Sequence, residues 1–82
     1  MYERVYNSVD SEYNWYISRV NEHRVMCHIS LDELSLRCGI DKANLSRIFS
    51  YKSVPSVKNL IKILDALNLR IGFKYGFLYP LM

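Results

Sequence analysis

The sequence predicts a mainly α-helical fold, a four-helix bundle followed by a C-terminal β-strand. Apolar residues recur at helical spacing from about residue 10 to residue 68. From Leu69 onward they alternate with period two, which is typical of a strand. The chain has 82 residues, enough for one core and too few for two. We divide it into residues 1–10, an N-terminal arm or helix extension, residues 11–68, a helical domain, and residues 69–82, a strand and tail.

The first helix is predicted at about residues 11–25, with Asp10 or Ser11 as its N-cap. The residues before it leave two alternatives open, because their spacing suits a continued helix and the alternation Tyr2–Arg4–Tyr6 also suits a strand. The upstream residues at helical spacing are Tyr2, Val5, Tyr6 and Val9, and the expected inward stripe of the helix itself is Tyr13, Tyr16, Ile17 and Val20.

Two short helices follow, joined by a turn that contains glycine. Ser30 with Glu33 three residues later is a capping box, which predicts a helix start. Gly39 ends this helix, because glycine tolerates the left-handed conformation, and Asp41 caps the next one. The two helices are expected at about 31–38 and 42–50, with Leu31, Leu34 and Cys38 inward on the first and Leu45, Ile48 and Phe49 inward on the second.

A fourth helix is predicted at about residues 57–67. The pair Val54-Pro55 breaks the helical pattern before it, because the residue that precedes proline is pushed to an extended conformation. Ser53 or Ser56 supplies the N-cap. The expected inward residues are Val57, Leu60, Ile61, Leu64 and Leu67.

The strand is predicted at about residues 69–77. One of its sides carries Leu69, Ile71, Phe73, Tyr75 and Phe77. A lone strand is unstable, so we expect it to pair across a homodimer or with residues 2–7 of its own chain.

The positive charge of the chain is concentrated in one segment. The formal net charge is +3, and no acidic residue lies between Asp41 and Asp65. The basic residues of this segment are Lys42, Arg47, Lys52, Lys58 and Lys62. Such a local concentration is typical of a nucleic-acid footprint. For Lys58 and Lys62, which are one helical turn apart, we favour a solvated helix face.

We interpret residues 31–50 as a helix-turn-helix, in which the second helix turns a polar face to the major groove of DNA. On a helical wheel, Ala43 and Arg47 point most directly away from the apolar residues. Arginine can pair with guanine, an amide with adenine, and a methyl group can touch thymine. The predicted base-reading residues are Lys42, Ala43, Asn44 and Arg47, and the predicted phosphate contacts are Ser46, Ser50, Lys52 and Ser53.

A wider pattern of residues accompanies this motif. It consists of Leu34, Ser35, Gly39, Ile40, Asp41, Leu45, Ser46, Arg47 and Ile48, continued by Lys52, Pro55-Ser56 and the run LIKILDALNL. With it, residues 13–71 resemble the Cro/CI (Xre-type) helix-turn-helix family, the lambda-repressor-like fold, in which Ser35 is usually alanine. The resemblance implies sequence-specific binding of double-stranded DNA, usually as a homodimer on a palindromic operator, and transcriptional repression or autoregulation.

The chain departs from the family pattern in three places. Phe49-Ser50-Tyr51 stands where the family commonly has Glu-Asn-Gly. Because the left-handed conformation is costly for tyrosine, we expect this loop to take a different course. Leu31 stands where many relatives have a polar residue that meets a phosphate. The strand at 69–77 replaces the frequent fifth helix, as in Cro-like repressors and some antitoxins.

The alternative function is that of an antitoxin, which binds a protein toxin and represses its own promoter. The candidate toxin-facing surfaces are Trp15 and the tail FKYGFLYPLM. Trp15 and Leu36 fall opposite the inward stripes of their helices, so we expect them to be covered by another part of the chain or by a partner. The candidate residues for a dimer or partner contact are Trp15, Leu36, Ile71, Phe73, Tyr75 and Phe77.

We expect no catalysis, cofactor or metal. The sequence has no glycine-rich phosphate loop and no H-E-x-x-H motif. Among the candidate metal ligands His23, Cys27, His28 and Cys38, the i, i+4 spacing of His23 and Cys27 is compatible with ligation at a helix end. The sequence has no C-x2-C pair, however, and Cys38 falls on the inward face of its helix, so we expect structural thiols and surface histidines. Because the sequence also lacks a secretory signal and an apolar run of membrane-spanning length, we expect reduced cysteines and a cytoplasmic protein that does not contact a membrane.

Overall fold

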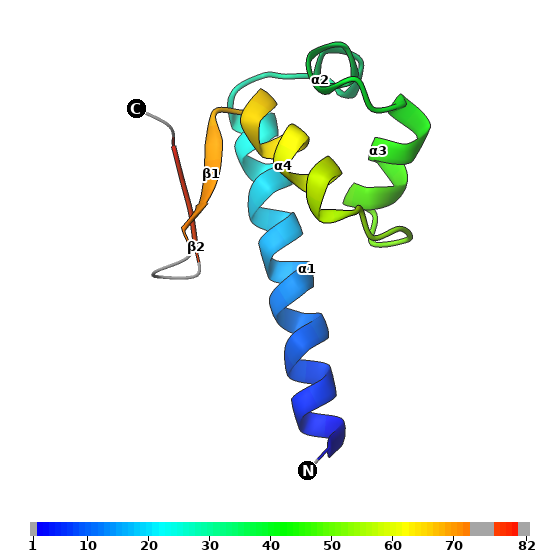
Figure 1. The fold of residues 1–82 in the computed structure, drawn as a ribbon, viewed down its shortest axis with the longest axis vertical. Coiled ribbons are helices and arrows are strands. Elements are labelled where there is room, and N and C mark those ends of the chain that lie inside the picture. The colour runs from blue at the N-terminus through cyan, green and yellow to red at the C-terminus, as the bar shows by residue number, and fades with distance from the viewer. Residues whose placement is uncertain (1, 73–76, 81–82) are drawn as a thin grey trace.

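The computed structural model describes the backbone of residues 2–72 and 77–80 and the side chains of residues 9–70. Its elements are α1 (Tyr2–Met26), α2 (Leu31–Cys38), α3 (Lys42–Phe49), α4 (Val57–Ala66), β1 (Leu69–Gly72) and β2 (Phe77–Pro80). The fold is mainly helical with a short β-structure at the C-terminal end, as predicted. In Figure 1, α2, α3 and α4 lie around the C-terminal half of α1, and β1 follows α4 on the opposite side from α3.

Helix α1 is longer than the predicted 11–25. It begins at Tyr2, so Asp10 and Ser11, which were expected to cap it, lie inside the helix. Both side chains are exposed, and an outward position lets polar residues remain in a helix interior. Residues 2–7 are helical, so the alternative that pairs them with the C-terminal strand is wrong. Figure 1 shows the N-terminal half of α1 extending away from the other elements.

The C-terminal strand is shorter than the predicted 69–77 and pairs within the chain. Strand β1 ends at Gly72, and β2 runs antiparallel to it, with Leu69 opposite Pro80 and Gly72 opposite Phe77. The predicted positions Phe73 and Tyr75 lie outside the described residues. A short connection is enough for a hairpin, so the strand finds its nearest partner locally.

The core lies between the C-terminal half of α1 and the three shorter helices. Its fully buried side chains are Ile17, Val20, Leu34, Leu45, Ile48, Ile63 and Leu64. On α4 the predicted inward face is wrong by part of a turn. Val57 and Ile61 are 73% and 54% exposed, whereas Ile63, which was not predicted, is buried. The residues of this segment that face the core are instead Leu60, Ile63, Leu64 and Leu67.

Each short helix begins at the cap that the sequence predicts. The Ser30 hydroxyl accepts a hydrogen bond from the backbone N–H of Glu33 at 3.0 Å, and the Asp41 carboxylate accepts one from that of Ala43 at 3.1 Å. Of the two candidate caps for α4, Ser56 fills the position. These caps satisfy backbone N–H groups that have no partner inside the helix.

The helices end in a common way. A residue in the left-handed conformation follows each of them, namely His28, Gly39, Tyr51 and Asn68. Only one of these is glycine. At Gly39 a Cβ atom would meet nothing within 4 Å, so the conformation of the backbone, not the space around it, favours glycine there.

Candidate nucleic-acid interface

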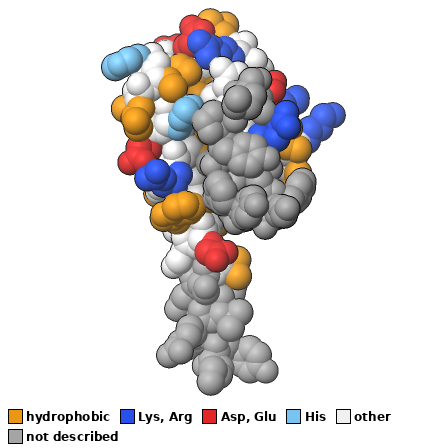
Figure 2. Space-filling model, turned by 90° about the vertical axis from the view of Figure 1, so that its left-hand side faces the viewer, with side chains coloured by type: hydrophobic (Ala, Val, Ile, Leu, Met, Phe, Trp, Pro, Cys, Tyr) orange, Lys and Arg blue, Asp and Glu red, His pale blue; other side chains and the backbone are white. Residues whose placement is uncertain are grey.

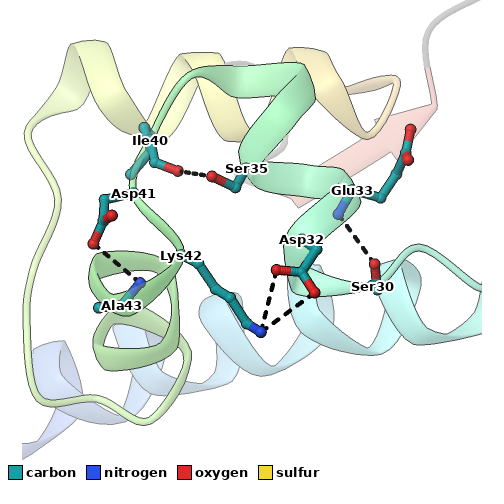
Figure 3. A network of polar contacts seen from close by, with 8 residues as sticks. All are labelled: Ser30, Asp32, Glu33, Ser35, Ile40, Asp41, Lys42 and Ala43. Atoms are coloured by element: carbon teal, nitrogen blue, oxygen red, sulfur yellow. Dashed lines mark hydrogen bonds and ion pairs between the residues drawn. The ribbon is translucent and has the colours of Figure 1, made fainter.

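The turn between α2 and α3 is fixed by two hydrogen bonds with Ser35 of α2. Gly39 ends α2 at φ 74°, and its N–H donates to the carbonyl of Ser35 at 2.8 Å. The Ser35 hydroxyl donates to the carbonyl of Ile40 at 2.6 Å, as Figure 3 shows. An alanine, which the family usually has at this position, cannot make the second bond. The angle between the two helices is therefore held by a side chain as well as by packing.

Helix α3 buries one side and leaves the other free. Leu45 and Ile48 are fully buried, and Phe49 packs against the core from a half-buried position. Among the predicted base-reading residues, Lys42, Ala43 and Arg47 are exposed and Asn44 is half-buried. Within the described part of the chain, nothing forms an ion pair with Arg47. The outward edge of α3 is thus accessible along its length.

Lys42, the first residue of α3, contacts α2. Its Nζ lies 3.2 Å from Oδ1 and 3.3 Å from Oδ2 of Asp32, and Figure 3 shows the side chain reaching across the turn. Both side chains remain more than half exposed. This pair was not predicted from the sequence. The partners are ten positions apart in the sequence, and no short-range rule links positions at that distance.

The residues predicted to contact phosphates differ in exposure and in whether they already form a hydrogen bond. Ser46 and Lys52 are exposed, and Ser53 is half-buried. The Ser50 hydroxyl donates a hydrogen bond to the carbonyl of Ser46. A phosphate contact by Ser50 as donor would require this bond to break.

The loop after α3 contradicts the sequence expectation. Tyr51 has φ 66°, so it takes the left-handed conformation that its side chain disfavours. The N–H of Tyr51 donates to the carbonyl of Ile48 at 3.1 Å, and that of Lys52 to the carbonyl of Arg47 at 2.8 Å. These two bonds form the Schellman motif that usually ends on glycine. The Tyr51 hydroxyl is hydrogen-bonded to Ser18 of α1, a tertiary contact that offsets the unfavourable backbone.

Arg24 of α1 contacts Phe49 at the end of α3, and this role was not predicted from the sequence. Its Nη1 donates to the carbonyl of Ile29 at 2.7 Å, its Nε donates to Oδ1 of Asn21 at 2.9 Å, and its guanidinium lies 5.6 Å from the centre of the Phe49 ring. Burial lowers the pKa of Arg24. The side chain connects the end of α1 to the end of α3. An arginine amid the polar and apolar residues of an amphipathic helix carries no sequence signal for this role.

The remaining predicted partner residues are placed as follows. Leu36 is 83% exposed and Trp15 is 55% exposed, with the Arg19 guanidinium 5.8 Å from the centre of the indole ring. The expected cover of these two side chains by another part of the chain is therefore not found among the described residues. For Ile71 and Phe77 the structure describes the backbone only. Figure 2 shows acidic, basic and hydrophobic side chains intermixed on the face that carries the hairpin.

Comparison with known families decides what this arrangement is. The model of a helix-turn-helix family (HTH_3, of the Xre/Cro-CI type) matches residues 20–74. The chain belongs to this family. It is therefore a DNA-binding transcription regulator with a double-stranded DNA partner. No curated protein and no solved structure matches the chain.

The family match sets limits on which parts of the chain are common to its relatives. It covers the end of α1, the helices α2 to α4 and strand β1, whereas the first part of α1 and strand β2 lie outside it. None of the helices in the described residues is long and apolar enough to cross a membrane.

Proposed function

We propose that the protein is a repressor or autoregulator that reads a palindromic operator with the outward edge of α3. The supporting observation is the two-sided character of this helix: Leu45 and Ile48 anchor it in the core, while Ala43 and Arg47 are exposed and unobstructed by described residues. The major groove is wide enough to admit a helix of this kind, and the helix carries the donors needed there.

The side chains of α3 have distinct roles in this proposal. Arg47 donates two hydrogen bonds to guanine, Asn44 pairs with adenine, and the Ala43 methyl group contacts thymine. Lys42 reaches a base edge from the N-terminal end of the helix. The phosphate contacts come from Lys52 and from the hydroxyl groups of Ser46, Ser50 and Ser53, and they fix the position of the protein on the duplex.

The experiment is selection of bound DNA from a random pool, followed by affinity measurements on the selected site. Arg47→Ala should weaken binding by about 1–3 kcal/mol and relax the preference at one position of each half-site. Arg19→Ala is the matched control, since it removes the same charge from α1, where Arg19 pairs with Glu22 at 2.7 Å. Equal binding by both variants would contradict the proposed reading edge.

We infer that the operator-binding form is a homodimer. A palindromic operator requires two recognition helices about 34–36 Å apart, one per half-site. The surfaces available for the contact include Leu36, Trp15 and the outer edges of the hairpin, with Ile71, Phe73, Tyr75 and Phe77 as its candidate residues. Light scattering should give twice the chain mass of 9.7 kDa. Leu36→Ser should lower this mass if α2 contributes, and a monomer in the wild type would contradict the dimer.

Antitoxin activity is the second candidate, favoured by the exposed indole of Trp15. This residue lies on the part of α1 that precedes the family match. An exposed aromatic ring outside the common domain is suited to a protein partner. Co-expression with the product of a neighbouring small gene should yield a complex that Trp15→Ala weakens. The absence of any such complex would leave the regulator as the whole function.

A further inference from the structure

We propose that Asp32 is a positioning residue for DNA recognition, which directs Lys42 to a base edge and keeps it from the phosphates. This inference deepens the proposed function and rests on α3 being the reading helix. It starts from the ion pair between the two residues, whose N–O distances are 3.2 and 3.3 Å.

The charges on α3 are distributed unevenly between its ends. At its N-terminal end, the Asp41 carboxylate caps the helix by accepting from the N–H of Ala43, and the Asp32 carboxylate pairs with the ammonium group of Lys42. Toward the other end, Arg47 and Lys52 are exposed and have no described ion-pair partner. Any sequence-independent attraction to the phosphates is therefore concentrated at the C-terminal end of α3.

A lysine at the start of a recognition helix can act in two ways. It can donate to a base edge in the major groove, or it can bind any nearby phosphate as a flexible point charge. The second contact adds affinity for every sequence and so lowers the preference for the operator. The Asp32 carboxylate restrains the ammonium group beside α2 and repels phosphates, which disfavours the second contact.

The ion pair is suited to restrain Lys42 without locking it. The side chain of Asp32 is 73% exposed and that of Lys42 is 57% exposed, so water screens their attraction. Lys42 can therefore turn from the carboxylate to a base acceptor at short range when the helix is seated in the groove. A buried pair in this position would not release it.

The test is a double-mutant cycle with Asp32→Asn and Lys42→Gln, measured on the selected operator and on DNA of unrelated sequence. Asp32→Asn should tighten binding to unrelated DNA by freeing Lys42 for a phosphate. One added phosphate contact steepens the slope of log affinity against log salt by about 0.9. The gain at 50 mM salt should then exceed the gain at 200 mM by about 3.5-fold, which is that slope applied to a fourfold change in salt.

The operator gives the second readout. Asp32→Asn should reduce the base preference at one position of each half-site, and Lys42→Gln should remove the preference of the lysine for guanine at that same position, since a glutamine amide favours adenine instead. In the Lys42→Gln background, Asp32→Asn should no longer change the salt slope. Glu22→Gln is the matched control, since it removes a carboxylate from an ion pair on α1 whose side chains are also more than half exposed, and it should change neither readout.

Two results would overturn the inference. Asp32→Asn without effect on unrelated DNA would show that the carboxylate does not restrain Lys42. An unchanged effect of Asp32→Asn in the Lys42→Gln background would show simple repulsion of DNA by Asp32. In either case Arg47→Ala would still weaken operator binding. If Arg47→Ala also has no effect, the proposed reading helix itself is wrong.

Discussion

The turns on either side of α3 end their helices in the same backbone conformation by different means. Before α3, glycine takes the left-handed position, with Gly39 at φ 74°. After α3, a tyrosine takes it, with Tyr51 at φ 66°. The first turn needs only a residue without a side chain. The second needs a contact from another helix, the hydrogen bond between Tyr51 and Ser18 of α1. Local chemistry therefore determines one end of the candidate reading helix, and tertiary structure determines the other.

The largest effect should come from truncating a core side chain of α3 itself. Ile48 is fully buried, and its carbonyl accepts the hydrogen bond from Tyr51. Ile48→Ala should lower the free energy of unfolding by about 2–5 kcal/mol, because it leaves a cavity beneath α3. Thermal or denaturant unfolding measures this. Val54→Ala is the control, since Val54 is 74% exposed and its truncation should change stability by about 0.5 kcal/mol or less.

The contrast between the turns predicts responses of different size to a substitution at the left-handed position. Gly39→Ala should destabilise the protein by about 1–2 kcal/mol, because it places a Cβ in that conformation. Tyr51→Gly removes the same unfavourable backbone energy of about 1–2 kcal/mol but also removes a hydrogen bond of about 0.5–1.5 kcal/mol. It should therefore change stability much less than Gly39→Ala does. A destabilisation at Tyr51 as large as that at Gly39 would contradict the distinction.

The tertiary contact can be tested by itself. Tyr51→Phe keeps the ring and removes the hydroxyl, and Ser18→Ala removes its partner. Each should lower the free energy of unfolding by about 0.5–1.5 kcal/mol, the usual contribution of one hydrogen bond. The double variant should be no less stable than either single one, since both remove the same bond. Additive effects would show that the two hydroxyl groups act independently.

The smallest predicted effect on the fold is at the turn before α3. Ser35→Ala removes the hydroxyl that donates to Ile40. We expect a decrease of about 0.5–1.5 kcal/mol in unfolding free energy, offset in part because alanine favours a helix interior more than serine does. Operator affinity measured alongside stability shows whether the bond also orients α3. A larger decrease in affinity than in stability would assign it that role.

The parts of the fold that sequence predicts well are those governed by neighbours in the chain. The caps at Ser30 and Asp41 and the glycine after α2 follow from short-range hydrogen bonding, and α2 begins and ends as expected. The predicted inward face of α4 was partly wrong. Val57 and Ile61 continue its apolar stripe, but the neighbouring elements do not cover these two side chains. Apolar spacing alone does not show where a stripe stops being buried.

The candidate site was predictable to the same extent. The outward edge of α3 follows from the buried positions of Leu45 and Ile48. The ion pair of Lys42 with Asp32, the contact of Arg24 with Phe49 and the left-handed Tyr51 could not be predicted, because each depends on a contact that reaches beyond a single helix. The spacing of apolar residues does not predict hydrogen bonds or ion pairs between polar side chains.

The central claim, that α3 reads base edges in the major groove, is tested most directly by altering that groove alone. The selected operator can be made with 7-deazapurines, which replace the N7 acceptors by carbon and leave the phosphates and the minor groove unchanged. Wild-type binding should weaken about 5- to 150-fold for each bidentate purine pairing that the replacement disrupts, the equivalent of about 1–3 kcal/mol, and Arg47→Ala should weaken less. Equal affinity of the wild type for the two DNAs would contradict the claim.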